Sequence, residues 1–296
     1  MRFFFGKVHI PRTSGSIYHR YKWIFIKQIL EVKRIMARIP IVMSIAGSDS
    51  GGGAGIQADL KTIAANGAYG TTVITAVTAQ NTVMVSGVKE MSTELVESQI
   101  DAVMSDIGAD VVKTGMLSSA EMILCVSRKI REYNITKFVL DPVMVATSGD
   151  SLLEEDAVDS IKKVLIPLCT IVTPNGPEAK KLTGIDVVDL DTARDAAIEL
   201  VKMGASAAVV KGGHIDGPAT DVLYDGNEFR MFTTKRIDSD NTHGTGCTFA
   251  SAIACGLASN RSLRDSVSSA KAYVTGGIRN GLKLGHGHGP LNHFHN

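Results

Sequence analysis

A short run near the carboxyl end, NTHGTGC at residues 241–247, combines residue types that can do chemistry. Gly244 and Gly246 leave the backbone bare where a loop turns into a helix of small residues. We therefore expect the N–H groups of Thr245, Gly246 and Cys247 to lie at the amino end of that helix, where the helix dipole favours an anion. Such a hole suits the charge that develops on a transferring phosphoryl group.

The cysteine in this run allows three interpretations. A helix dipole lowers the pKa of a thiol at this position, so Cys247 could act as a base or a nucleophile. A cysteine acyl-transferase would pair Cys247 with His243 or His214, but the sequence shows no third group to orient the histidine. A capped helix start with Cys247 as a small core residue is the structural alternative. A phosphate-handling site is favoured, because phosphoryl transfer mainly needs positioning and charge neutralisation.

A second glycine-rich segment, AGSDSGGGAGIQAD at residues 46–59, joins a predicted strand to a predicted helix. Residues 53–58 match the dinucleotide pattern GxGxxA, but that motif needs an acid about 20 residues later, and the first acid after Asp59 is Glu90. No GK[ST] run is present, which excludes a Walker A loop. The segment remains either a close-approach loop with Asp49 at its rim or a plain tight turn.

Polar residues follow three other predicted strands. Asn175 and Glu178 stand three residues apart, where an amide and a carboxylate can hold water around Mg²⁺. Lys211 stands beside two glycines and could steer nucleotide phosphates, and Asp141 is a further candidate metal ligand. The loop around Gly149 is a candidate lid. Each feature alone is equally typical of a turn, but together they predict a site at the carboxyl ends of parallel strands.

The elements that must position these residues follow from the apolar pattern. Short apolar runs alternate with segments of helical periodicity. We expect strands at 39–47, 71–79, 110–115, 137–141, 169–175 and 207–213, and helices at 55–67, 95–108, 118–134, 154–166, 176–184, 191–204, after 246 and at 262–280. A β-hairpin is predicted near residues 221–232, around Asp225-Gly226. This order predicts an α/β fold with a mostly parallel central sheet and helices on both faces.

Composition and charge limit the classes of protein. The 296 residues are 44% apolar and 21% charged, which is globular. The net charge of +1 gives no reason to expect nucleic acid as the main partner. Residues 1–38 hold nine Lys or Arg and one acid, while the remainder has a net charge of −7. We interpret 1–38 as a basic extension, either non-native or an organelle-targeting segment. Residues 39–296 are expected to form a single domain.

Cysteines and hydropathy bear on the compartment. The four cysteines show no CxxC spacing, which is no disulfide framework and favours a reducing compartment such as the cytoplasm. No apolar run approaches the roughly 20 residues that span a bilayer. A membrane partner is therefore not expected.

The motifs taken together carry a resemblance to a known family. The runs AGSDSGGGAGIQADLKT, AVTAQNT, KTGML, LDPVM, TPNGPEA, KGGH, THGTGCT and GHGPLNHF occur in this order over about residues 40–293. As a set they resemble the hydroxymethylpyrimidine and phosphomethylpyrimidine kinases of thiamine biosynthesis, in the ribokinase-like superfamily. The resemblance implies a single α/β kinase domain, commonly a homodimer, that uses ATP and Mg²⁺.

The resemblance also implies a substrate pocket. Asp59 and Gln80 would hydrogen-bond the edge of the aminopyrimidine, and Met116 and Val143 would form apolar walls. A site that pairs with ring donors and acceptors rejects rings that lack them.

On the nucleotide side the resemblance implies ATP-binding roles for Asn175, Glu178, Lys211 and Gly213, together with the loop Gly244–Gly246. In the wider superfamily the position of Cys247 usually holds an aspartate that acts as the base. Here it is cysteine, so either a base or a group that holds the reacting oxygen remains open.

The function implied is ATP-dependent phosphorylation of 4-amino-5-hydroxymethyl-2-methylpyrimidine and then of its monophosphate to the pyrophosphate. The alternative is a pyridoxine or pyridoxal kinase, since related proteins with GTGC act on those rings. A ligand-sensing module without turnover would need the anion hole lost, and it is intact in this sequence. The tail at residues 285–296 holds four of the eight histidines. It could bind a metal, but the resemblance places its GHGP run near the nucleotide.

Overall fold

The computed structural model describes residues 38–145 and 155–295. Contacts divide the chain into one unit at residues 1–39 and a compact unit at 40–296. Apart from Arg38, the basic extension lies outside the described residues, and so does the candidate lid around Gly149. The domain boundary expected after residue 38 stays a prediction.

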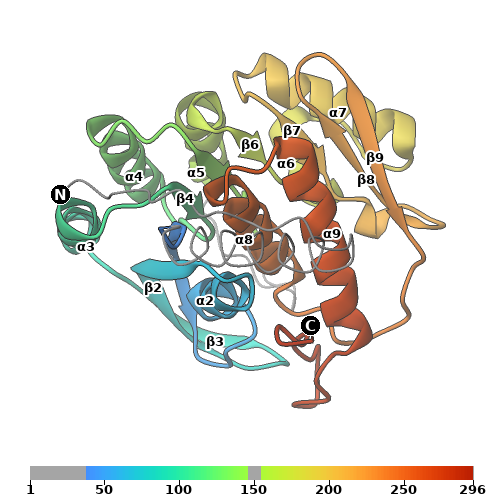
Figure 1. Cartoon of the computed structure of the whole chain (residues 1–296), viewed down its shortest axis with the longest axis horizontal. Coiled ribbons are helices and arrows are strands. Elements are labelled where there is room, and N and C mark those ends of the chain that lie inside the picture. Colours follow the sequence, from blue (N-terminus) through green and yellow to red (C-terminus); the bar gives the residue numbers. More distant parts are fainter. Residues whose placement is uncertain (1–37, 146–154, 296) are drawn as a thin grey trace, which may run out of the picture. The chain divides into compact units, whose positions relative to one another are not determined.

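In the part of the chain described, nine strands form one sheet in the order β3-β2-β1-β4-β5-β6-β7-β8-β9 (Figure 1). The strands are β1 (Ile41–Asp49), β2 (Tyr69–Gln80), β3 (Val85–Glu90), β4 (Val111–Thr114), β5 (Phe138–Leu140), β6 (Ile171–Val172), β7 (Ala208–Val210), β8 (Ala219–Tyr224) and β9 (Phe229–Thr234). β1, β2 and β4 to β7 pair in parallel, whereas β3, β8 and β9 pair antiparallel to their neighbours. The predicted mostly parallel α/β sheet is confirmed.

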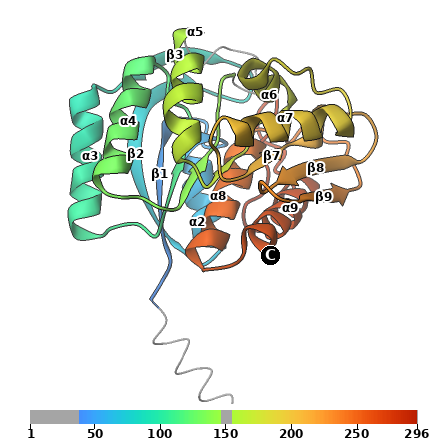
Figure 2. The same cartoon turned by 90° about the horizontal axis from the view of Figure 1, so that it is seen from above.

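Helices cover both faces of the sheet (Figure 2). They are α2 (Gly55–Ala65), α3 (Thr93–Asp106), α4 (Ala120–Glu132), α5 (Glu155–Ser160), α6 (Gly176–Thr183), α7 (Leu190–Lys202), α8 (Thr245–Ala258) and α9 (Leu263–Arg279). One apolar cluster joins the sheet to α2, α8 and α9, and the other joins it to α3 through α7. Strands β1 and β4 to β7 have residues in both clusters and are therefore buried on both faces, which explains their continuous apolar runs, whereas β2 has residues in one cluster only.

Helix α8 is buried along most of its length, and its side chains are mostly small. It reads TGCTFASAIACGLA, and all of its residues from Thr248 to Ala258 are buried. A Cβ at Gly256 would lie 2.5 Å from the Oγ of Ser266 on α9, so only glycine fits there. This close contact joins α8 to α9 near the carboxyl end of α8.

Of three local features, one agrees with the prediction from the sequence and two differ from it. The hairpin is confirmed as β8 and β9, with Gly226 at φ +90° in its turn. Strand β3 was not predicted, because its residues are mostly exposed and show no core pattern. The helix expected at 154–166 is α-helical only from Glu155 to Ser160. A π-helical turn (Ile161–Leu165) follows it, and then a 3₁₀ turn (Ile166–Leu168) that contains Pro167. Proline lacks the N–H that an α-helix would need there.

A buried ion pair joins four elements beneath the site. Lys113 on β4 and Asp59 on α2 are both 0% exposed, and the Nζ lies 2.9 Å from each carboxylate oxygen. Ser44 of β1 donates to Oδ2 at 2.5 Å, and Ser251 of α8 donates to Oδ1 at 2.7 Å. Each oxygen of the carboxylate thus has two donors, which is what makes a charge tolerable at this depth.

Replacing one partner of this pair should be costly. We expect Lys113→Met to lower the free energy of unfolding by about 3–5 kcal/mol, because it leaves the Asp59 charge buried and unpaired. The double variant Lys113→Met with Asp59→Asn removes that charge and should recover part of the loss. Urea denaturation of the two variants and the wild type measures the difference. A Lys113→Met protein as stable as wild type would contradict this account.

Candidate active site

The site lies where β5, β7 and the start of α8 meet. A Cβ built on Gly246 would lie 3.2 Å from the Nζ of Lys211, just after β7, and 3.7 Å from Oδ2 of Asp141, just after β5. The structure therefore brings together three residues that are 70 and 35 positions apart along the chain. The crossover topology does this, since parallel strands end at one edge of the sheet.

The amino end of α8 offers two free donors rather than the three expected. Gly244 caps the helix at φ +80°, in the left-handed region that favours glycine. The N–H of Thr245 donates to the carbonyl of Thr242 at 3.2 Å, so it is used within the turn. The N–H groups of Gly246 and Cys247 make no hydrogen bond to the described residues. The predicted anion hole is thus reduced to these two groups.

The thiol of Cys247 differs from expectation in its acidity. Burial raises its pKa to about 12, and the carboxylates of Asp59 and Asp141 raise it further, while Lys113 and the N–H of Gly55 lower it. The predicted lowering is wrong, because loss of water and two nearby negative charges outweigh the helix end. The thiol is therefore protonated at neutral pH and can donate a hydrogen bond.

Asp141 carries a polar atom that lacks a partner. Its side chain is 1% exposed, and Oδ1 lies 3.3 Å from the Oγ1 of Thr173 and 3.4 Å from the Nζ of Lys211. Oδ2 is buried without a hydrogen bond to any described residue. A buried carboxylate oxygen needs a partner, and a hard cation such as Mg²⁺ is one that carboxylates bind. Asp141 therefore fits the candidate metal ligand.

Asn175 and Glu178 have a local structural role that the sequence did not show. Oδ1 of Asn175 accepts from the N–H of Glu178 at 2.9 Å, and Oε2 of Glu178 accepts from the N–H of Asn175 at 2.7 Å. This capping box starts α6. Burial raises the pKa of Glu178 to about 7, and Asp141 adds to this although Lys211, 3.7 Å away, opposes it. Their contact with metal-bound water stays a prediction.

The four residues expected in the substrate pocket divide into two groups. Gln80 ends β2 half-buried, its Oε1 accepts from Thr78 at 3.0 Å, and its Nε2 makes no hydrogen bond to a described residue. Met116 follows β4 and Val143 follows β5, which places them at the same sheet edge as Gln80. Asp59 does not fit, because it is fully buried and its oxygens are used by Lys113 and two serines.

Gly213, expected on the nucleotide side, is exposed and belongs to a short turn after β7. A Cβ at Gly213 would meet nothing within 4 Å. An ATP contact of Gly213 stays a prediction.

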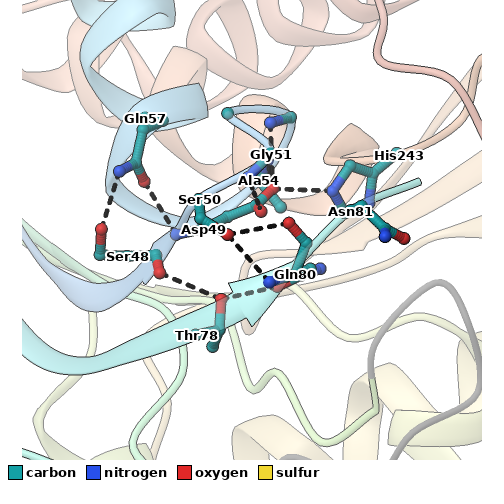
Figure 3. A network of polar contacts seen from close by, with 12 residues as sticks. Ser48, Asp49, Ser50, Gly51, Ala54, Gln57, Thr78, Gln80, Asn81 and His243 are labelled. Carbon is teal, nitrogen blue, oxygen red and sulfur yellow. Dashed lines mark hydrogen bonds and ion pairs between the residues drawn. The ribbon is translucent and has the colours of Figure 1, made fainter. Parts of the chain in front are cut away.

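Sequence reasoning missed a pair that lies 194 residues apart, Asp49 and His243. The carboxylate of Asp49 is 3% exposed, and its Oδ2 lies 2.8 Å from Nε2 of His243 (Figure 3). Burial opposes ionisation, but this contact and the N–H groups of Ala54 and Gly51 hold the pKa of Asp49 below its usual value. Both residues stand in glycine-rich runs, which is a signal for each, but nothing in the sequence joins them.

The tail packs against the start of α8. His293 is 4% exposed, its Nε2 lies 3.0 Å from the Oγ1 of Thr248, and its carbonyl accepts from the hydroxyl of Tyr273 at 2.6 Å. The GHGP run meets the site as well, since Gly289 accepts from the N–H of His243. In the described part of the chain, no group of three or more His, Cys, Asp or Glu could hold a metal ion.

A parallel α/β sheet whose strand ends meet such a helix start is the architecture of ribokinase-like small-molecule kinases. The family model described as phosphomethylpyrimidine kinase matches residues 49–292. The chain belongs to this family of hydroxymethylpyrimidine and phosphomethylpyrimidine kinases, which are phosphotransferases of thiamine biosynthesis.

Two relatives and one solved structure show the extent of the similarity. The bifunctional thiamine biosynthesis protein ThiED of Geobacter sulfurreducens is 53% identical over 86% of this chain, which spans about half (52%) of that protein's length. The hydroxymethylpyrimidine/phosphomethylpyrimidine kinase of Bacillus subtilis is 48% identical over 85% of this chain and 94% of its own. An ADP complex of Bacillus subtilis pyridoxal kinase superposes with a TM-score of 0.82 at 34% identity, covering 87% of this chain and 98% of that one.

The chain is a kinase of a group that binds adenine nucleotides and acts on small molecules. Among the described residues, no helix has both the length and the apolar character needed to cross a membrane.

The buried His293 should make stability depend on pH. Burial lowers its pKa to about 4, with help from Lys61 and His295, below the usual 6.5. Since the unfolded chain binds the proton more tightly, this contribution is complete above pH 6.5 and is lost as pH falls towards 4. Between pH 7.5 and 5 the wild type should lose about 2 kcal/mol more unfolding free energy than His293→Gln. Urea titrations at both pH values measure this.

The matched control is His288→Gln, which changes an exposed histidine of the same tail. It should follow the wild type at both pH values, because His288 is exposed and takes no part in the contacts that bury His293. Equal pH dependence in the wild type and His293→Gln would refute the buried neutral state.

Proposed function

We propose that this chain transfers the γ-phosphoryl group of ATP to the hydroxymethyl oxygen of 4-amino-5-hydroxymethyl-2-methylpyrimidine, and then phosphorylates the monophosphate to the pyrophosphate. The observation that carries the proposal is the glycine-flanked start of α8, where Gly246 faces Lys211 and Asp141. Family membership supports the choice of ring.

The phosphate end of the site supplies positioning and charge. The N–H groups of Gly246 and Cys247, which make no hydrogen bond to the described residues, would bind a γ-phosphate oxygen at the positive end of the helix dipole. Lys211 stands beside them, and neighbouring carboxylates raise its pKa although burial opposes this, so it is cationic. Oδ2 of Asp141 would hold Mg²⁺, which supplies positive charge to the phosphates when bound.

We assign Cys247 to holding the hydroxymethyl oxygen. Its protonated thiol is a hydrogen-bond donor, and a strong base is not needed early because the transferring group is loosely bonded in the transition state. Formation of the new P–O bond makes the attacking hydroxyl more acidic, so its proton leaves late in the reaction and passes to a phosphate oxygen or to solvent, while Cys247 keeps its own proton.

The ring end of the site rests on Gln80. An amide presents one donor and one acceptor, which matches a ring nitrogen beside an amino group. Met116 and Val143 would supply apolar walls, and Asp59 would support the pocket floor from below through Lys113. A pyridoxal or pyridoxine substrate is the second candidate, since a pyridoxal kinase shares this fold with a TM-score of 0.82. Its identity of 34% is lower than the 48% of the pyrimidine kinase relative.

We also propose that the protein is a cytoplasmic homodimer. Val83, Met84 and Val88 are exposed on and beside β3, with Val77 of β2 in the same hairpin, and a second copy would cover them. All four cysteines are free, as expected in a reducing compartment.

The proposed substrate has a direct test by mass spectrometry. With ATP, Mg²⁺ and hydroxymethylpyrimidine we expect first a product with one added phosphate and then one with two. Pyridoxal in the same assay should gain one phosphate at most, and more slowly. Fast phosphorylation of pyridoxal with no pyrophosphate of the pyrimidine would favour the second candidate.

The role of Cys247 is tested by two substitutions. Cys247→Ala removes the group that holds the hydroxymethyl oxygen, and kcat should fall about 100-fold, as when one hydrogen-bond donor to a reacting oxygen is lost. Cys247→Ser keeps a donor and should retain more of the rate. The KM for ATP should stay within about threefold, since the N–H groups remain. A kcat of Cys247→Ala equal to wild type would remove the thiol from the reaction.

A further inference from the structure

We propose that Asp49 and His243 form a positioning pair that holds the glycine-rich loop after β1 against the start of α8. The proposal rests on the function proposed above and assigns to it two residues that make no contact with the reacting atoms. Figure 3 shows the pair and the loop around it.

Asp49 organises its own loop. Oδ1 accepts from the N–H of Gly51 at 2.8 Å, and Oδ2 accepts from those of Gly53 and Ala54 at 3.0 and 2.9 Å. Its backbone N–H donates to Gln57 of α2 at 2.9 Å. With His243 the carboxylate has four partners. An aspartate can satisfy them because both of its oxygens accept, whereas an asparagine has one acceptor oxygen.

The two loops touch without any side chain between their glycines. A Cβ at Gly244 would collide with the carbonyl of Gly53, and a Cβ at Gly53 would collide with the ring of His243. The ring therefore lies directly against the loop that Asp49 holds. Two glycine backbones in contact have no side chains that interlock and fix their relative position. The hydrogen bond from His243 to Asp49 therefore sets how the two loops align.

His243 is held from the other side by the tail. Its N–H donates to the carbonyl of Gly289 at 3.1 Å, and the residue pairs with Pro290 in a parallel bridge. Leu291 anchors that part of the tail in the core, where it is fully buried. The backbone of His243 is thus held by the tail, and its ring is held by Asp49.

The loop positions groups at both ends of the reaction. The N–H of Gly55, where the loop enters α2, faces the thiol of Cys247. The hydroxyl of Ser50 donates to the carbonyl of Gln80 at 2.8 Å and accepts from its N–H at 2.9 Å. The pair therefore sets the distance between the residue assigned to the ring and the residue assigned to the reacting oxygen.

The consequence is a specific kinetic pattern. A displacement of about 1 Å in a reacting group costs about 100-fold in rate. Without the pair, Gln80 and Cys247 lose their alignment, while Lys211 and Asp141 still bind the nucleotide. The loss should therefore fall on kcat and leave the KM for ATP nearly unchanged.

A double-variant cycle tests the pair in the full-length protein. We expect Asp49→Asn and His243→Leu each to lower kcat for hydroxymethylpyrimidine about 30- to 100-fold, with KM for ATP within about threefold. The double variant should fall no further than the slower single variant, since both remove one interaction. His243→Gln can place its Nε2 near that of the ring and should stay within about tenfold of wild type.

The control is Asp101→Asn, which breaks contacts of comparable type with Lys129 and Tyr133 away from the site. It should lower stability and leave kcat unchanged. The proposal is overturned if both single variants keep kcat within about twofold of wild type, or if their effects multiply in the double variant.

Folding and the proposed function are separated by a second measurement. Amide hydrogen exchange at Gly53 and Ala54 should be faster in His243→Leu than in His243→Gln, whatever the activity. If Asp49→Asn does not fold, the two His243 variants decide the question, and equal exchange and equal kcat overturn the pair. A wild type that phosphorylates no pyrimidine contradicts the proposed function, and exchange then decides the pair alone.

Discussion

The contact between two stretches of bare backbone is the constraint on which the site depends. Gly53 and Gly244 meet where a single methyl group on either residue would force the loops apart. This close approach lets the start of α8 face the strand ends, and it requires glycines in two loops separated by almost the whole domain. Glycine backbones in contact have no side chains that interlock. Polar side chains nearby must therefore define how the two loops align.

Charge is arranged in two layers around that contact. The deeper layer is the pair of Lys113 and Asp59, which has donors for every carboxylate oxygen and ties α2, α8, β1 and β4 together. The upper layer contains Lys211, Glu178 and Asp141, and here one oxygen of Asp141 has no hydrogen bond to the described residues. In a structural ion pair every charged atom has a partner within the protein. A charged atom that lacks one can instead bind a charged group of a ligand.

The thiol lies between the two layers and takes its properties from both. Cys247 stands at a helix start, which alone would favour the thiolate, yet burial and the carboxylates of Asp59 and Asp141 raise its pKa. A neutral thiol in this place suits a reaction that needs the substrate oxygen to be held more than it needs a strong base. In a more exposed site the same thiol would have a lower pKa, because burial is the largest cause of the increase.

The sequence by itself determined the α/β class, the hairpin and the strand ends that carry the candidate site residues, because these follow from local periodicity and glycine placement. Only the tertiary structure decided that Asp59 belongs to a buried ion pair, that Asn175 and Glu178 start a helix, and that His243 holds Asp49. The physical reason is that partner choice and burial are non-local. The sequence shows that a residue is an aspartate or a glutamate but not whether its carboxylate contacts a ligand, a lysine or an amide. Only the fold brings one of these partners to it.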